Sequence, residues 1–190
     1  EYGVKIIEDA SHAIGSKFLN QYVGNCMFSD VTVFSFHPVK IITTAEGGLA
    51  TTNNQKIAER MQLFRTHGIT RDEKLLTKDS EGGWYYEQLE QGFNYRLTDI
   101  QAALGNSQLT RMQFFIEKRH MIKDRYEQLI SNENLDLPAQ DKKCFSSLHL
   151  YPIQLKLEKL KKSQQEIFAD FQTNGIGVNL HYIPVHYHPY

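Results

Sequence analysis

The stretch FSFHPVKIITTAEGG, residues 34–48, decides how this chain is interpreted, because it leads from a strand-like run to a lysine and a glycine-bounded loop. Residues 31–36, VTVFSF, are mostly β-branched or aromatic, which is typical of a strand. Pro38 cannot donate a backbone hydrogen bond and is expected to end that strand. Ser35 and Lys40 are therefore expected at or beyond its C-terminal end.

A second short apolar run precedes this one and also ends in polar residues. Residues 5–9, KIIED, read as a strand with the carboxylate of Asp9 at its tip. In an open sheet, the carboxyl ends of parallel strands and the loops that leave them form the ligand crevice. If the two strands run side by side in the same direction, Asp9 and Lys40 are expected to face one ligand.

A lysine, a carboxylate and a hydroxyl at one sheet edge fit the needs of pyridoxal phosphate. A free lysine amine, with a pKa of about 10.4, is a weak nucleophile and needs a special setting to react with an aldehyde. The cofactor also requires a carboxylate at its ring nitrogen and donors for its phosphate. Taken singly, Lys40 is more often a solvated lysine, Asp9 a turn cap and Ser35 an ordinary strand serine. Their co-occurrence favours the cofactor site.

Five motifs stand out in order along the chain: EDASHA at 8–13, SFHPVK at 35–40, AEGG at 45–48, GFNYRL at 92–97 and NLHYIPVH at 179–186. They resemble those of the DegT family of nucleotide-sugar aminotransferases, pyridoxal phosphate enzymes with the aspartate aminotransferase fold. Within that family, the chain is most similar to the pseudaminic acid branch, which aminates a UDP-linked 4-keto-6-deoxy sugar.

The resemblance implies a role for each of the matching residues. Lys40 would hold the cofactor as a Schiff base and move a proton during catalysis, while Asp9 would bind the pyridinium nitrogen. Ser35 would contact the cofactor phosphate. Asn94 would reach the phosphate bound by a partner subunit, which implies a homodimer with shared sites, and Arg96 would bind the sugar nucleotide's diphosphate.

Three histidines complete the site that the resemblance implies. His12 would lie near the hydroxyl of the cofactor ring, in a place that is often occupied by glutamine, and His181 and His186 would approach the sugar. A metal site formed by the C-terminal histidines is the alternative. No carboxylate or thiolate is interleaved among them, and Pro184 interrupts regular geometry, so we expect no metal.

The length of 190 residues raises the question of how much of such an enzyme is present. Complete family members are much longer, so the resemblance implies a fragment: residues 1–110 as part of the large cofactor-binding domain, and 111–190 as a connecting long helix with part of a small α+β domain. The expected fold class is α/β, with a mostly parallel sheet. Two alternatives remain: a catalytically inert fragment, and a related sugar dehydratase, which would lack the Schiff-base lysine.

Local patterns predict the remaining elements. Asn54 is expected to cap a helix that stops at Gly68, and Thr98 with Gln101 forms a capping-box pattern. The interval from 69 to 91 reads as a loop. The other expected elements are one long helix over 100–129, strands over 148–155 and 176–183, and a helix over 164–174.

Composition narrows the function classes. The formal net charge is −1 and 41% of the residues are hydrophobic, so no strong field attracts nucleic acid or anionic lipid. No apolar run reaches the roughly 20 residues of a membrane span. The two cysteines lack metal or disulfide spacing. Composition thus favours a cytoplasmic protein, and the resemblance implies an enzyme whose partners are a nucleotide sugar, an amino donor such as glutamate, and a second copy of the chain.

Overall fold

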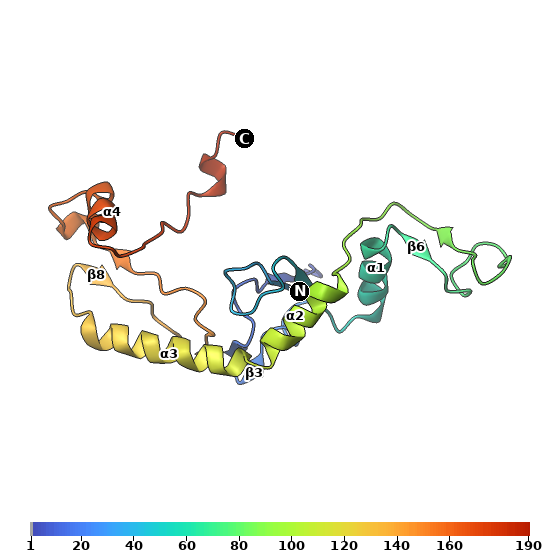
Figure 1. The fold of residues 1–190 in the computed structure, drawn as a ribbon, viewed down its shortest axis with the longest axis horizontal. Helices are drawn as coiled ribbons and strands as arrows, with labels where there is room; N and C mark the ends of the chain where they lie inside the picture. Colours follow the sequence, from blue (N-terminus) through green and yellow to red (C-terminus); the bar gives the residue numbers. More distant parts are fainter. Residues whose placement is uncertain (1) are drawn as a thin grey trace. The chain divides into compact units, whose positions relative to one another are not determined.

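A computed structural model describes residues 2–190, and the chain divides into two compact units, each described by itself below. The first unit comprises Glu1–His120 and Asp141–His149, and the second comprises Met121–Gln140 and Leu150–Tyr190. Both contain helices and short strands (Figure 1). The chain is therefore a mixed α/β protein, as the sequence predicts.

The main sheet of the first unit carries the two predicted strand ends. Its order is β1 (Ile7–Asp9), β4 (Val31–Ser35) and β5 (Gly48–Thr51). β1 runs parallel to β4 with Asp9 opposite Val33, so the expected side-by-side arrangement is confirmed. β5 is antiparallel to β4, with Ser35 opposite Gly48. Asp9 and Ser35 consequently lie at the same edge of the sheet.

A small apolar core lies directly behind these strand ends. Alternate residues of β4 point inward, including the buried Phe34. Ala10 is 2% exposed and follows Asp9, while Ile41 is 4% exposed and follows Lys40. The buried apolar residues of this core are Ala10, Phe34, Phe36, Ile41, Ile42 and Ile116. Burial of the neighbouring apolar residues thus fixes the backbone that carries both polar side chains.

The helices of the first unit begin where the sequence predicts. α1 (Gln55–Arg65) is capped by the Asn54 side chain, which accepts from the backbone N–H groups of Lys56 and Ile57. α2 (Asp99–Leu109) begins with the capping box of Thr98 and Gln101. Both N-terminal predictions are confirmed.

The single long helix predicted over 100–129 is wrong, because two helices occupy that interval (Figure 1). α2 ends at Leu109 and α3 runs from Met112 to Leu129. At the break, the Thr110 hydroxyl donates to the Ser107 carbonyl, 2.9 Å away, and the Arg111 N–H donates to the Gln108 carbonyl. Such side-chain bonding to the backbone competes with helical continuation.

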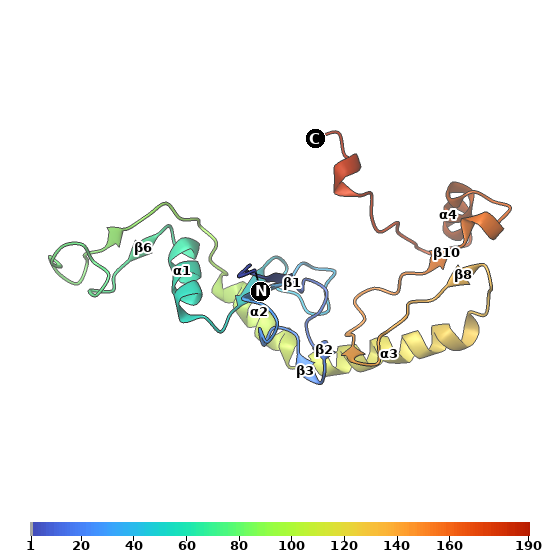
Figure 2. The same ribbon diagram turned by 180° about the vertical axis from the view of Figure 1, so that it is seen from behind.

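Two small ladders complete the first unit. β2 (Lys17–Phe18) pairs with β3 (Gln21–Tyr22) and with β9 (Cys144–Phe145), beside the early turns of α3 (Figures 1 and 2). β6 (Ile69–Thr70) pairs with β7 (Glu87–Gln88). The interval 69–91, predicted as a loop, therefore contains a two-residue ladder that joins its two ends.

The strands of the second unit differ from those that the sequence predicts. It holds β8 (Leu135–Asp136), β10 (Gln154–Leu155), a 3-10 turn at Leu157–Lys159, α4 (Gln164–Thr173) and a second 3-10 turn at Val185–Tyr187. α4 and its capping box at Ser163 agree with the predicted helix. The strand predicted over 148–155 shrinks to two residues, and 176–183 forms no strand. A β-branched run forms a strand only when a neighbour pairs with it, which local propensity cannot supply.

No helix within residues 2–190 is long and apolar enough to cross a membrane.

Candidate active site

Asp9 ends β1 in a turn that holds its carboxylate in the charged form. Its Oδ1 accepts from the Ser11 backbone N–H at 3.0 Å and from the Ser11 hydroxyl at 2.5 Å. These bonds, the hydroxyl first, lower the pKa of Asp9, and the charges of His12 and Lys40 lower it further. Asp9 is thus an anion prepared to pair with a cationic group.

Lys40 lies in a turn that follows β4. Its backbone N–H donates to the His37 carbonyl at 3.0 Å, and the His37 ring accepts from the Val39 N–H at 3.4 Å. The side chain of Lys40 is half-buried. The parallel pairing of β1 and β4 thus places Asp9 at one strand end and Lys40 in the turn after the next, where the charge of Lys40 helps to lower the pKa of Asp9.

Ser35 lies at the same edge, as the last residue of β4. Its Oγ accepts from the His37 N–H at 3.4 Å. The opposite residue on β5 is Gly48, where an added Cβ would lie 2.8 Å from the Phe34 carbonyl oxygen. The close approach of the two strands beside Ser35 therefore requires a glycine at this position.

The loop between Lys40 and β5 is anchored to α2. The Thr44 hydroxyl and the Gln101 side-chain amide both donate to the Glu46 carbonyl, at 2.8 and 2.9 Å. A Cβ on Gly105 of α2 would lie 2.8 Å from the Thr44 methyl group, so the helix and the loop are in close contact. Gln101, a member of the capping box of α2, thus also positions the loop that follows Lys40.

His12 lies three residues after Asp9 and contacts a histidine from a distant part of the sequence. The centroids of the His12 and His149 rings are 4.2 Å apart, and the ring planes are inclined by 55°. The Asp9–His12–Lys40 group therefore acquires a neighbour that no motif in the sequence indicates.

Asn94 and Arg96 occupy a different part of the first unit. Asn94 forms an isolated bridge with Thr66 at the end of α1, flanked by bonds from the Phe93 N–H to the Phe64 carbonyl and from the Tyr95 N–H to the Arg65 carbonyl. Both predicted residues are exposed. The structure thus places them on an extended segment along the end of α1, leading into α2.

His181 and His186 lie in the second unit. Each forms a T-shaped contact with the tyrosine that follows it, with ring centroids 4.5 Å apart for His181 and 4.4 Å apart for His186. Both are exposed. Residues 2–190 contain no group of three or more histidine, cysteine, aspartate or glutamate side chains arranged to hold a metal ion.

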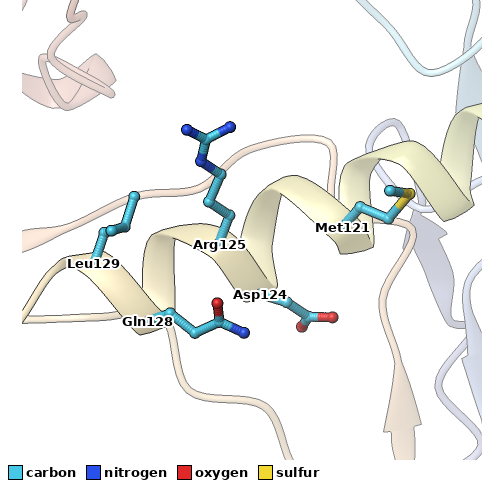
Figure 3. Close-up of a pocket in the computed structure, with 5 residues that line it drawn as sticks. All are labelled: Met121, Asp124, Arg125, Gln128 and Leu129. Carbon is cyan, nitrogen blue, oxygen red and sulfur yellow. The ribbon is translucent and has the colours of Figure 1, made fainter.

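A shallow depression on the second unit is lined entirely by α3. Figure 3 shows its side chains leaving one helix in several directions, with no second element opposite. None of the site residues predicted from the sequence lies in it. The residues that line it are Met121, Asp124, Arg125, Gln128 and Leu129.

Three residues that support the candidate site around Asp9, His12 and Lys40 were assigned no site role from the sequence. Ser11 follows Asp9 by two positions, which is the spacing of a side-chain turn, so a local signal existed. Gln101 was expected to cap α2, but its bond to the Glu46 carbonyl crosses 55 positions. His149 is separated from His12 by most of the chain and had no sequence signal.

Parallel strands with polar residues at their carboxyl ends and helices around them are the arrangement in which α/β enzymes commonly bind ligands. The chain belongs to the DegT/DnrJ/EryC1/StrS aminotransferase family, whose profile matches residues 1–190.

Individual relatives agree with this family. A UDP-4-amino-4,6-dideoxy-N-acetyl-beta-L-altrosamine transaminase of Campylobacter jejuni is 38% identical over 188 residues, which are 98% of this chain and 46% of that protein. The structure of Helicobacter pylori PseC, an aminotransferase involved in the biosynthesis of pseudoaminic acid, superimposes with a TM-score of 0.84 at 36% identity, covering 98% of this chain and 47% of that one. The Streptococcus pneumoniae protein Spr1654 in its PLP-form gives a TM-score of 0.81 at 31% identity, covering 96% and 45%.

The chain spans about half the length of the curated relatives that it matches. The fold expectation is confirmed by these likenesses, since the solved neighbours are sugar aminotransferases that superimpose over nearly all of this chain.

Proposed function

We propose that the protein containing this sequence is a pyridoxal phosphate-dependent aminotransferase of a nucleotide-linked 4-keto-6-deoxy sugar. The observation that carries the proposal is that Asp9 and Ser35 end two neighbouring parallel strands, with Lys40 in the turn that follows the second strand. An aldehyde cofactor with a basic ring nitrogen needs a nearby amine and a nearby anion. The chemistry of the residues present fits that group.

Each residue of the group has a distinct task in this proposal. Bound pyridoxal phosphate would supply an electron sink for carbanion charge. The anionic carboxylate of Asp9, which Ser11 stabilises, would hold a proton on the ring nitrogen. Lys40 Nζ would hold the cofactor and would carry the proton at the reacting carbon. The Ser35 hydroxyl would donate to the phosphate.

The substrate half of the proposal rests on the family and on the named relatives. A relative that is 38% identical over 98% of this chain is named for transamination of a UDP-linked dideoxy sugar. A sugar nucleotide carries a diphosphate, for which Arg96 offers a guanidinium group, and the exposed His181 and His186 are candidates for the sugar hydroxyls. We assign glutamate as the amino donor and a second copy of the protein as the partner that receives Asn94.

The dehydratase alternative is less favoured because it requires the Schiff-base lysine to be absent. Lys40 is present, in a turn next to the buried Ile41, and its charge is among those that lower the pKa of Asp9. We therefore retain transamination as the proposed reaction.

Covalent labelling tests this proposal without requiring the natural substrate. The full-length protein is incubated with pyridoxal phosphate, freed of excess cofactor, reduced with borohydride and digested. We expect the reduced cofactor on the peptide that contains Lys40. Lys40→Ala should remove this label and should lower turnover of a UDP-linked 4-keto sugar by at least about a thousandfold, because the covalent route is lost.

The matched control is Lys56→Ala, which removes an exposed lysine from the first turn of α1. This variant should retain both label and turnover. Label spread over several lysines, or turnover that survives Lys40→Ala, would overturn the mechanism. The same labelling applied to residues 1–190 alone tests the inert-fragment alternative, for which weak or absent selective label is expected.

A further inference from the structure

His149 approaches the proposed cofactor site from the far end of the first unit's sequence. Its ring lies against the His12 ring at a centroid distance of 4.2 Å, and His12 is close enough to Asp9 to influence the Asp9 carboxylate. A flat ring packed on a second flat ring limits how that second ring can rotate. His149 is thus placed to determine the orientation of His12.

The segment that carries His149 is held on one side by a buried serine pair. The Ser147 N–H donates to the Ser16 hydroxyl at 2.9 Å, and the two hydroxyl oxygens are also 2.9 Å apart. Ser16 is 8% exposed and Ser147 is fully buried. A buried polar pair of this kind is costly to break, so it fixes the segment beside the turn that leads from His12 to Ser16.

Two side chains of α3 hold the same segment from another direction. The Arg119 guanidinium donates to the carbonyls of Leu148 and His149, at 3.0 and 3.2 Å. His120 Nε2–H donates to the Ser146 carbonyl at 2.9 Å. The backbone before and at His149 is therefore held at three carbonyl groups, those of Ser146, Leu148 and His149, and at the N–H group of Ser147.

The backbone conformation at Leu148 is unfavourable in free energy, and it lies directly before His149. Leu148 has a φ of 56°, in the left-handed region that a leucine rarely occupies. Strained non-glycine residues persist when their surroundings hold them, and they concentrate at functional sites. The bonds from Ser16, Arg119 and His120 supply that support, and the outcome is the contact between His149 and His12.

We propose that His149 is a positioning residue of the cofactor site, which sets the orientation of the His12 ring. This inference rests on the proposed function, because His12 requires orientation only if a cofactor ring lies beside Asp9. His149 itself makes no contact with the cofactor in this proposal. Its effect passes entirely through His12.

A double-mutant cycle on the full-length protein tests the inference. The readouts are the dissociation constant of pyridoxal phosphate and the visible circular dichroism of the bound cofactor, whose sign and intensity report the asymmetry of its surroundings. His149→Ala should weaken binding about threefold to tenfold and change the dichroism band. His149→Phe, which retains a flat ring, should restore both readouts to near the wild-type values.

Coupling to His12 distinguishes positioning from general support of the fold. In the His12→Ala background, His149→Ala should cause no additional change, because residues that act through one group are non-additive. His188→Ala serves as the control for loss of an exposed histidine and should leave both readouts unchanged. Thermal unfolding of each variant verifies that the compared proteins are folded.

The outcomes separate this inference from the proposed function. If the wild-type protein binds no pyridoxal phosphate at Lys40, the proposed function fails. If the wild-type protein binds at Lys40, two results overturn the positioning role alone. One is that the effects of His149→Ala and His12→Ala on binding add. The other is that His149→Ala has no effect on binding. If His149→Ala fails to fold, the test uses His149→Phe, alone and combined with His12→Ala. A substantial loss of cofactor binding in His149→Phe would contradict positioning by a flat ring.

Discussion

The chemistry of the candidate site depends at the residue scale on one serine. Ser11 gives Asp9 two hydrogen bonds, one from its backbone and one from its hydroxyl, and both favour the carboxylate form. The resulting decrease in the pKa of Asp9 means that the anion is stabilised in the folded state. This contribution to stability is present above the ordinary aspartate pKa and is lost as the pH falls through the lower, folded value.

Ser11→Ala should therefore raise the pKa of Asp9 toward its ordinary value without fully restoring it. The hydroxyl bond is lost, whereas the backbone N–H of the alanine still donates. A carbon-detected NMR titration of the Asp9 carboxyl group measures this shift directly. Ser80→Ala, which removes a hydroxyl that bonds only within its own loop, is the control and should leave the titration of Asp9 unchanged.

At the scale of elements, the loop after Lys40 is positioned by α2 rather than by its own sequence. Gln101 bonds to the Glu46 carbonyl, and Gly105 lies against the buried Thr44. Glycine within a helix ordinarily costs stability relative to alanine. Here it permits the helix and the loop to approach closely.

Gly105→Ala should consequently destabilise the protein by about 1–3 kcal/mol, opposite in sign to the usual effect in an exposed helix. The new Cβ would meet the Thr44 methyl group at 2.8 Å, and a β-branched side chain has little freedom to move away. Urea unfolding of the full-length protein measures the change in the free energy of unfolding.

Combining this change with Thr44→Ser supplies the matched control. Serine lacks the obstructing methyl group but keeps the hydroxyl that donates to the Glu46 carbonyl. The double variant should therefore recover part of the lost stability. Equal or greater stability of Gly105→Ala alone would show that the contact between helix and loop is looser than described here.

At the scale of the molecule, the first unit leaves apolar side chains exposed just before and within α2. Ile100 is 85% exposed and Tyr95 is 73% exposed, and their neighbours Phe93, Leu97 and Leu104 are also exposed. Clusters of exposed apolar residues commonly mark an interaction surface. Asn94, which we propose to serve a partner subunit, lies in the same stretch.

We therefore expect the chain to self-associate through this surface. Light scattering should give a molar mass above the 22.0 kDa of one chain, and Ile100→Glu should return it toward that value. Asn106→Glu adds the same charge to an exposed polar position of α2 and should leave the association intact. A wild-type mass of one chain, or equal effects of the two variants, would contradict the expectation.

The sequence predictions were mostly correct where the interactions behind them join residues that are close in the sequence. The starts of α1 and α2 were correct because their caps lie within a few residues. The strand predicted over 31–36 was found at 31–35, and its aromatic residue Phe34 is part of the core. The prediction of an uninterrupted helix was wrong because apolar spacing does not report the local bond from the Thr110 hydroxyl to the Ser107 carbonyl. The strand predicted at 176–183 was wrong because no neighbouring strand pairs with it.

By itself, the sequence determined the α/β class, the strand ends that carry Asp9 and Lys40, and the helix caps, because alternation of apolar residues and capping chemistry act over short distances. Tertiary structure alone decided the parallel register that brings Asp9 and Lys40 together, the bond from Gln101 to the loop, and the packing of His149 against His12. These contacts join residues tens to more than a hundred positions apart. Their formation depends on how the core folds, which no local pattern specifies.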